Sequence, residues 1–460
     1  NQYNFTIDEN SIEDSELSID PEMLGRIFEN LLAEINPETS QNARKSTGSY
    51  YTPREIVDYM VSSSLLEYLK TKAFIDEEIL KTIIFKNEEP KNDYDKAKIL
   101  SAIFELKILD PACGSGAFPM GLLQKIVKIL NLIDPDASIW FGLQNKEFRD
   151  THKDRNKDYM RKLSIIKNTI YGIDIQPIAI EISKLRFFLS LIVDEEGEPE
   201  PLPNLEFKFV CANTLLPLAK NTTLSSQDYF DYQNKLKELK SKYFEACSTN
   251  KKDIKENYKS TQKKLFDEIV ALSIGEALDS SLANYDPFNP LSVAGFFDSD
   301  FMFNIKDGFD IVIGNPPYLG EKGNKETFAP LKKLKYYQGK MDLFYFFFHI
   351  GLDNLKNGGI LSLITTNYYI TATGAVKLRN DFQERSTILN LINFNELKIF
   401  ESALGQHNLI TTLQKGKFDK PAHTSIVNAK GYLGTEILQS IVEGKNKDTN
   451  YYQIPQEKLF

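Results

Sequence analysis

Cysteine and histidine are scarce in this chain of 460 residues. Its three cysteines (Cys113, Cys211 and Cys247) stand far apart, which excludes a disulfide framework and a zinc knuckle. Such usage is typical of a reducing, cytoplasmic setting. The four histidines belong to no motif, and no metal-ligand spacing is present. The chemistry therefore has to be sought in other residue types.

Long apolar runs and excess positive charge are also missing. The longest apolar run, "LFYFFFHIGL" (343–352), falls short of the roughly 20 residues that a membrane span needs. The net charge of −9 argues against a wholly basic nucleic-acid-binding domain, although a local basic surface is compatible with it. No signal peptide is visible, and because the sequence begins with Asn1 we expect an excised piece of a longer chain.

From residue 107 the sequence alternates between short apolar runs and amphipathic segments, which predicts parallel βαβ units in a doubly wound α/β sheet. A Lys-rich, helix-forming stretch interrupts the pattern, and we interpret its charges as a solvated face rather than a DNA-tracking surface. The aromatic run 344–348 is continuously apolar and predicts a buried helix. The predicted strands are "KILD" (107–110), "TIYGID" (169–174), "LEFKFVCAN" (205–213), one starting at residue 309, "GILSLITT" (359–366), "ILNLINF" (388–394) and "LITTLQ" (409–414).

A glycine-containing turn follows the first strand in "ILDPACGSGAFPMG" (108–121). Asp110 ends the strand, and Gly114 and Gly116 let the backbone approach a ligand closely. The stretch is no dinucleotide fingerprint, because the third glycine of that pattern would fall at Pro119. It is no P-loop either, since no Gly-Lys-Ser/Thr follows.

Two further polar residues end predicted strands. Asp174 stands where a doubly wound fold places the carboxylate that accepts ribose hydroxyls, although a residue in this position also serves as a helix cap. Asn213 ends the third strand, where its amide either reads an adenine edge or caps the next turn. Each signal is weak alone.

The fourth predicted strand ends in "FDIVIGNPPYLG" (309–320). An exocyclic aromatic amine is a poor nucleophile because its lone pair is delocalised, and two acceptors on its N–H groups would free that lone pair. The side-chain oxygen of Asn315 and the carbonyl of Pro316 are suitable acceptors, and Tyr318 offers a ring to stack on the base. The prolines then serve as preorganisation.

Five segments taken in order, "TGSYYTP" (47–53), "LDPACGSGAF" (109–118), "YGIDIQPIAIEISKLR" (171–186), "CANTLL" (211–216) and "GNPPY" (314–318), resemble the amino-group DNA methyltransferases. More narrowly, the chain is similar to the gamma-class N6-adenine enzymes of type IIG restriction–modification proteins. The resemblance covers roughly residues 20–415. It implies a Rossmann-like methyltransferase fold, S-adenosylmethionine as cofactor and no metal for the methyl transfer.

The resemblance also implies a role for each matching residue. Those expected at the cofactor are Thr52 at the methionine end, Asp110, Ala112 and Gly114 around the methionine, Asp174 at the ribose, Asn213 at the adenine and Pro317 beside the sulfonium. Asn315, Pro316 and Tyr318 are expected to hold the target amine, with Phe400 in "LKIFESA" on the far face of the flipped base. Many family members have Asp where Asn213 stands, which weakens that contact.

The expected regions, in order, are an N-terminal helical segment (1–45), the cofactor-binding half of the core (46–220), a helical insertion (221–285), the catalytic half (286–415) and the start of a truncated C-terminal target recognition region (416–460). The expected partner is double-stranded DNA with its target adenine flipped out. The first motif lies near the start and leaves no room before it for a nuclease. We expect the complete recognition domain in the parent chain, whereas the sequence does not decide whether that chain also has a nuclease. We further expect this fragment to bind S-adenosylmethionine but to show weak or no sequence-specific methylation of DNA.

Other members of the same chemical class remain open at this stage. Methylation of cytosine N4, of an RNA base or of a protein glutamine uses a related turn, although "TGSYYTP" favours DNA adenine over glutamine. A catalytically silent, cofactor-binding subunit of a defence complex is the alternative from another class. The intact Asn-Pro-Pro-Tyr turn argues against it.

Overall fold

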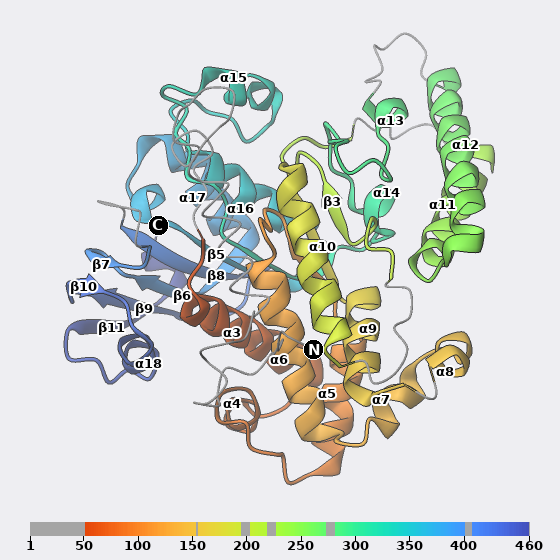
Figure 1. Ribbon diagram of the computed structural model, residues 1–460. Coiled ribbons are helices and arrows are strands. Elements are labelled where there is room, and N and C mark those ends of the chain that lie inside the picture. Colours follow the sequence, from red (N-terminus) through yellow and green to blue (C-terminus); the bar gives the residue numbers. More distant parts are fainter. Residues whose placement is uncertain are drawn as a thin grey trace, which may run out of the picture.

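A central β-sheet organises the part of the chain that the computed structural model describes, which comprises residues 51–152, 155–194, 203–218, 227–272, 281–400 and 407–459. Within these residues the sheet has nine strands in the spatial order β11-β9-β6-β8-β5-β4-β1-β2-β3 (Figure 1). In chain order they are β1 (Ile108–Asp110), β2 (Ile170–Asp174), β3 (Phe209–Cys211), β4 (Phe309–Gly314), β5 (Leu355–Thr366), β6 (Ser386–Asn393), β8 (Asn408–Lys415), β9 (Ala422–Val427) and β11 (Thr449–Ile454).

The strand directions create a topological switch point between β1 and β4. Strands β3, β2, β1, β4 and β5 run parallel to one another. The chain passes from β1 to β2 and β3 on one side and returns to β4 on the other. Open α/β sheets bind ligands at such a point, outside the carboxyl ends of the strands. The doubly wound, Rossmann-like α/β fold predicted from the sequence is confirmed.

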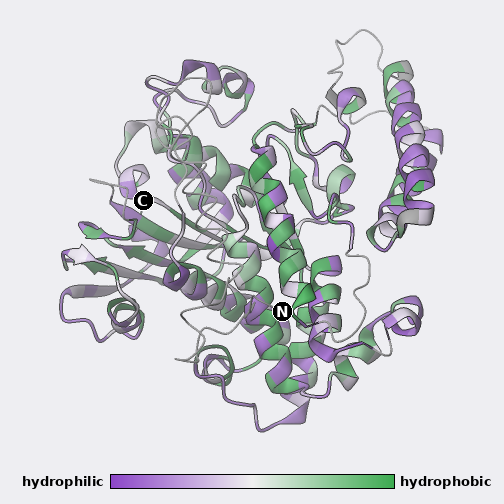
Figure 2. Ribbon diagram, in the orientation of Figure 1, coloured by the Kyte–Doolittle hydropathy of each residue, from purple (hydrophilic) through white to green (hydrophobic). Residues whose placement is uncertain are grey.

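Buried side chains cover both faces of the sheet, as in a three-layer α/β structure. In β1 and β4, Ile108 and Ile311 pack into one core with the helices of the N-terminal half. Leu109 and Val312 pack into the other, which holds the aromatic run 344–348. That run forms a buried helix, as predicted. Figure 2 shows the hydrophobic residues along the sheet and the helices that cover it.

Helices connect the strands. Those of the N-terminal half are α3 (Arg54–Ala73), α4 (Glu77–Lys86), α5 (Asp93–Glu105), α6 (Ala117–Ile133), α7 (Ser138–Leu143), α8 (Lys146–His152), α9 (Lys157–Asn168) and α10 (Pro177–Ile192). Those that follow β4 are α15 (Lys325–Phe328), α16 (Leu343–Asn354), α17 (Val376–Arg385) and α18 (Thr435–Val442). Short 3-10 turns and a two-stranded ribbon complete the described part: η1 (Pro330–Lys333), η2 (Asn367–Ile370), η3 (Thr373–Ala375), η4 (Gln456–Lys458), β7 (Leu397–Lys398) and β10 (Gly431–Tyr432).

A helical hairpin separates β3 from β4. It consists of α11 (Gln227–Phe244) and α12 (Ser248–Leu272), and the short helices α13 (Ser281–Asn284) and α14 (Ser299–Phe303) follow it. The hairpin lies at the right edge of the molecule and is mostly hydrophilic (Figures 1 and 2). It falls within the segment for which the sequence predicts a helical insertion.

Two features of the sheet differ from the expected pattern. The strand expected at 409–414 is present as β8, but it runs antiparallel to both of its neighbours, β5 and β6. Beyond Gly416 we expected a separate region to begin, yet β9 pairs with β6 and β11 pairs with β9 in the same sheet. The expected N-terminal helical segment (1–45) lies outside the described residues. No helix in the described ranges has both the length and the apolarity of a membrane span.

Candidate active site

The polar residues predicted from the sequence lie together at the carboxyl ends of the parallel strands. Asp110 ends β1, Asp174 ends β2, Asn213 follows β3 by two residues and Asn315 directly follows β4. These four strands are adjacent in the order β4-β1-β2-β3 and are parallel. Their carboxyl ends therefore lie side by side, at the switch point.

Asp110 is almost wholly inaccessible to solvent, with 1% of its surface exposed. Its Oδ1 accepts a hydrogen bond from the backbone N–H of Ala112 at 3.1 Å. Its Oδ2 has no hydrogen-bond partner among the described residues. Burial raises the pKa of this carboxyl well above its usual value, and the nearby charge of Asp174 raises it further. Asp110 thus has a buried side-chain oxygen, Oδ2, that can form a further hydrogen bond.

The turn after β1 depends on glycine. Gly114 and Gly116 have φ values of 53° and 87°, in the left-handed region that favours glycine. A Cβ on Gly116 would lie 2.9 Å from the Oγ of Ser183. Ser183 in turn donates a hydrogen bond to the carbonyl of Gly114 at 2.9 Å, and Arg186 donates to that of Ser115 at 2.9 Å. Helix α10 therefore fixes the backbone of this turn.

Asp174 ties the first two strand ends together. Its Oδ2 accepts from the N–H of Gly114 at 2.9 Å, and its Oδ1 accepts from the N–H of Gln176 at 2.8 Å. The second bond goes to the N-cap residue of α10 and not to an N–H of the helix, so Asp174 shapes the turn before α10 but is not its cap. The next residue, Ile175, is 56% exposed although it is apolar. Ile175 was not among the residues predicted from the sequence. The only feature that marks it there is its position directly after the strand-end carboxylate of Asp174.

Asn213 also stabilises a local turn. Its Oδ1 accepts from the N–H of Leu215 at 3.1 Å, and its own N–H donates to the carbonyl of Ala294 at 2.8 Å. The side chain therefore shapes the loop after β3, which was one of its two predicted roles.

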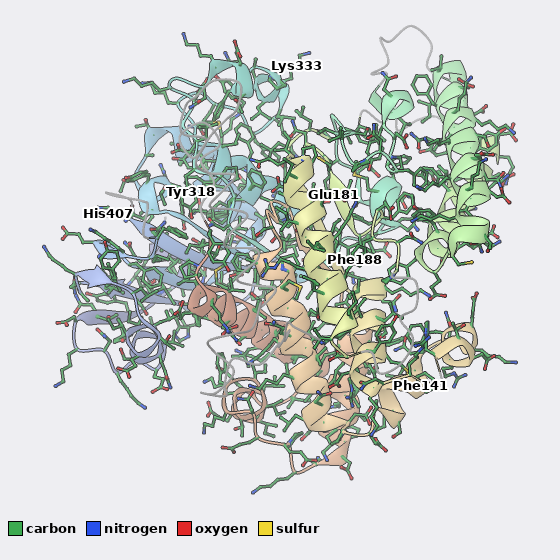
Figure 3. All side chains as sticks on the ribbon, viewed as in Figure 1. Phe141, Glu181, Phe188, Tyr318, Lys333 and His407 are labelled. Carbon is green, nitrogen blue, oxygen red and sulfur yellow. The ribbon has the colours of Figure 1, made fainter. Side chains whose placement is uncertain are left out.

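The Asn-Pro-Pro-Tyr turn is linked to the loop that precedes α3. The Nδ2 of Asn315 donates to the Oγ1 of Thr52 at 3.1 Å, across 263 positions of sequence. The hydroxyl of Tyr318 donates to the Oδ1 of Asn315 at 2.6 Å and also lies 3.1 Å from the carbonyl oxygen of Ile364 in β5. The amide is thus held on both sides. Figure 3 labels Tyr318 at this edge of the molecule.

Gly314 allows this turn to sit against β1. A Cβ at Gly314 would lie 2.7 Å from the Oδ1 of Asp110. The residue before Asn315 therefore has to be glycine if Asp110 and the turn are to pack this closely.

Comparison with known proteins identifies a family whose matched segment contains several of these strand-end residues. Residues 168–400 match the family described as Eco57I restriction-modification methylase. The chain belongs to this family. Its match takes in the strand ends of Asp174, Asn213 and Asn315 and continues to Phe400.

Several relatives of this Eco57I-like chain are much longer proteins. A putative type II restriction enzyme and methyltransferase of Methanocaldococcus jannaschii is 26% identical over 474 residues, which cover 85% of this chain and 37% of that protein. The Escherichia coli type II restriction enzyme and methyltransferase RM.Eco57I is 22% identical over 442 residues, 93% of this chain and 35% of that protein. The chain therefore spans little more than a third of either.

Shorter and structural matches add to the comparison. A type II methyltransferase of Aneurinibacillus aneurinilyticus, M.BanIII, is 27% identical over 132 residues, 28% of this chain and 22% of that protein. Among solved structures, a DrdV–DNA complex aligns over 98% of this chain and 34% of its own, with 13% identity and a TM-score of 0.48. At that level of similarity we transfer no residue role from it.

Phe400 lies near Tyr318 but not parallel to it. Its side chain is buried, with 3% exposed, and the two ring centroids are 6.4 Å apart with an interplanar angle of 61°. Phe344 approaches the same tyrosine ring at 6.1 Å and 78°. The rings meet edge to face, so they do not yet frame a gap for a base between parallel faces.

Among the described residues, no group of three or more His, Cys, Asp or Glu side chains is arranged to hold a metal. What the site brings together is a buried carboxylate, a glycine turn and an anchored amide. This is a donor and acceptor set for an organic ligand at the strand ends.

Proposed function

We propose that this chain is the modification part of a restriction–modification protein and transfers a methyl group to the N6 amine of an adenine flipped out of DNA. The observation that carries the proposal is the anchored amide of Asn315 at the carboxyl end of β4, next to the buried Asp110 of β1. Membership of the Eco57I-like methylase family supports it.

The residues of the strand ends suit S-adenosylmethionine. Asp110 offers a buried oxygen with no partner among the described residues, and the left-handed Gly116 keeps a side chain out of the turn. In the proposed arrangement Thr52, Asp110, Ala112 and Gly114 hold the methionine part, Asp174 the ribose, Asn213 and the exposed Ile175 the adenine, and Pro317 borders the sulfonium. When bound, this cofactor supplies an electrophilic methyl group.

Asn315 and Pro316 prepare the amine that accepts the methyl group. The Oδ1 of Asn315 has two lone pairs, so it can accept an amine N–H as well as the Tyr318 hydroxyl. The Pro316 carbonyl takes the other N–H. With both N–H groups held, the nitrogen would become pyramidal and its lone pair would become available. The N–C bond would then form as the S–C bond to the transferred methyl group breaks, with the electron pair staying on sulfur, and the methylated nitrogen would lose one proton to solvent water. The two prolines keep both acceptors in place, and this preorganisation lowers the barrier.

Aromatic side chains offset the cost of moving the base. Extrusion of a base from the duplex costs roughly a few kcal/mol. Stacking recovers roughly 1–3 kcal/mol per base. Tyr318 is the stacking partner, and Phe400 covers the opposite face once the edge-to-face contact between the two rings opens.

The direct test compares Asn315→Ala with the unaltered full-length protein. Transfer of tritium from labelled S-adenosylmethionine to DNA should fall at least about 100-fold, because the variant lacks an acceptor that acts in the transition state. Cofactor affinity, measured by calorimetry, should stay within about twofold, a small free-energy change on the scale of RT.

A matched control is Asn257→Ala, whose side chain is exposed on the surface of α12. It should transfer methyl groups like the unaltered protein. Normal DNA methylation by Asn315→Ala would overturn the catalytic assignment, and an unaltered protein that binds the cofactor but never methylates DNA would favour a silent cofactor-binding subunit.

A further inference from the structure

A basic loop begins two residues after Tyr318. We call residues 320–341 the lysine excursion; it contains α15 and η1 and returns to the core at α16. It holds six lysines and two glutamates, a net charge of +4 within a chain of net charge −9. All six lysines are exposed: Lys322, Lys325, Lys332, Lys333, Lys335 and Lys340.

These lysines form no salt bridges within the described part of the chain. Among the ion pairs of the described residues, none involves a lysine of the excursion. Of the two glutamates, Glu321 instead accepts a hydrogen bond from the hydroxyl of Tyr337 at 2.6 Å, inside the excursion. That hydrogen bond lowers the pKa of the Glu321 carboxyl, and the nearby charge of Lys332 lowers it further. Lys335 lies over the ring of Tyr336 at 4.6 Å. With a net charge of +4, most of the positive charge is nevertheless available to an external anion.

The helical hairpin α11–α12 provides the contrast. It is also rich in lysine, with ten lysines, but it carries eight acidic residues over 46 positions. Several of its lysines form ion pairs, among them Lys242 with Glu238 and Lys259 with Asp286. Its charge is therefore largely balanced, in keeping with the solvated face expected from the sequence.

The excursion is firmly attached to the core. Phe328 and Leu331 are buried, and the ring of Phe328 contacts that of Phe346 in α16 at 6.3 Å. Lys377 of α17 donates to the carbonyls of Lys335 and Tyr337, both at 2.8 Å. Its lysines are thus presented by an anchored scaffold rather than by a loose loop, which reduces the entropy lost on binding.

The position of the excursion is set by the catalytic turn itself. The two ends of the excursion are held together by an isolated antiparallel β-bridge between Gly320 and Asp342. The backbone N–H of Leu343 also donates a hydrogen bond to the carbonyl of Leu319 at 2.8 Å. Two residues span at most roughly 7 Å, so the excursion starts beside the target amine. Figure 3 shows Lys333 above Tyr318, and Figure 1 shows α15 well apart from the α11–α12 hairpin.

We infer that the lysine excursion binds the backbone phosphates of the DNA that carries the target base. The inference rests on the proposed function, because it is the base held at Asn315 that brings a DNA strand to this edge. Ammonium groups on long side chains suit phosphates as point charges. Contacts of this kind fix position and orientation without reading sequence. An otherwise acidic chain thereby presents its positive charge where the duplex has to open.

The test removes two adjacent charges in the full-length protein with Lys332→Gln and Lys333→Gln. The probe is a fluorescent mixed-sequence DNA duplex, titrated at several salt concentrations. We expect the affinity to fall roughly tenfold and the dependence of log K on log salt to become shallower by about 0.9 for each phosphate that the protein no longer neutralises. Methyl transfer at saturating DNA and the affinity for S-adenosylmethionine should stay unchanged.

Two matched variants complete the design. Lys263→Gln with Lys264→Gln removes an equally exposed pair from α12 and should leave DNA affinity and its salt dependence unchanged. Lys332→Arg with Lys333→Arg keeps both charges and should retain affinity.

If the excursion pair and the α12 pair affect DNA binding equally, or neither does, the inference is wrong while the proposed methylation stands. If the unaltered protein never methylates DNA, the proposed function fails, and the inference fails with it.

Discussion

At the scale of single residues, the contact between Thr52 and Asn315 gives the threonine a second role. The family resemblance assigns Thr52 to the cofactor, but its hydroxyl accepts the hydrogen bond from the Asn315 amide at 3.1 Å. Together with Tyr318, this bond fixes which edge of the amide presents its oxygen. In the proposed mechanism, Thr52 is therefore a positioning residue for Asn315.

Thr52→Val should lower kcat by up to about 100-fold, because a misplaced catalytic group can cost that much. Thr52→Ser keeps the hydroxyl and should stay close to the unaltered protein. Steady-state kinetics with varied S-adenosylmethionine separates the two roles. A raised KM for the cofactor with an unchanged kcat would show that Thr52 serves the cofactor alone.

Asp110 leads to a prediction about stability and pH. Since burial raises the pKa of Asp110, the folded protein favours the protonated carboxyl, and stability from this group is lost as the pH rises through the folded-state pKa. Asp110→Asn retains an acceptor for the Ala112 N–H and removes the buried charge. Without cofactor, the variant should be more stable than the unaltered protein at high pH, because it has no buried carboxyl group to ionise.

Thermal unfolding of the cofactor-free protein between about pH 5 and pH 8 checks this prediction. The difference between variant and unaltered protein should shrink toward the acidic end, where both side chains are neutral. If the stability difference between Asp110→Asn and the unaltered protein did not change with pH, ionisation of the buried Asp110 carboxyl would not be its cause. The same variant should bind S-adenosylmethionine more weakly.

At the scale of elements, a polar network around the mostly buried carboxylate of Asp381 joins α16 to α17. The Nδ1 of His349 lies 2.5 Å from Asp381, and Arg385 pairs with the same carboxylate through two nitrogens. Burial lowers the pKa of His349, which favours a neutral ring that donates to Asp381. Burial opposes ionisation of Asp381 as well, but hydrogen bonds from His349 and Arg385 lower its pKa overall.

Asp381→Asn should therefore destabilise the fold by about 1–3 kcal/mol, because it removes the charged acceptor that the buried His349 ring and Arg385 share, while Arg385 keeps its ion pair with Asp353. Asp353→Asn removes the more exposed partner of the same Arg385 and should cost at most about 1 kcal/mol. Denaturant unfolding of the two variants gives both numbers. Equal effects would show that the network is a surface feature.

The contribution of Asp381 to stability should be present above the ordinary pKa of an aspartate and be lost as the pH falls through its lowered folded-state value. Acid unfolding of Asp381→Asn should accordingly show a weaker pH dependence than that of the unaltered protein. The element pair α16–α17 also carries the lysine excursion, so this network stabilises the surface from which it projects.

At the scale of the whole molecule, the sequence predicted the parallel strands of the sheet better than its C-terminal strands β8, β9 and β11. β1, β2, β4 and the second half of β5 are mostly apolar and buried, and burial on both faces leaves that signature in a parallel strand. The antiparallel direction of β8 could not be predicted, because a buried strand has the same apolar sequence pattern whether it runs parallel or antiparallel to its neighbours. β9 and β11 were missed because most of their residues are only partly buried or exposed, so they lack a continuous apolar run.

The site was predictable for a similar reason and to a similar extent. The strand-end residues Asp110, Asp174 and Asn315 follow from where apolar runs stop. The hydrogen bond between Thr52 and Asn315 depends on packing across 263 positions, which a local pattern does not contain. The edge-to-face contact of Phe400 with Tyr318 is likewise a matter of tertiary geometry, and the stacking role of Phe400 stays a prediction.

The identity of the methylated atom tests the central claim most directly. The full-length protein is incubated with DNA and isotope-labelled S-adenosylmethionine, and the digested nucleosides are analysed by mass spectrometry. The account predicts label in N6-methyladenine, and at least about 100-fold less of it with Asn315→Ala. Label in N4-methylcytosine, or no labelled nucleoside from the unaltered protein, would contradict it.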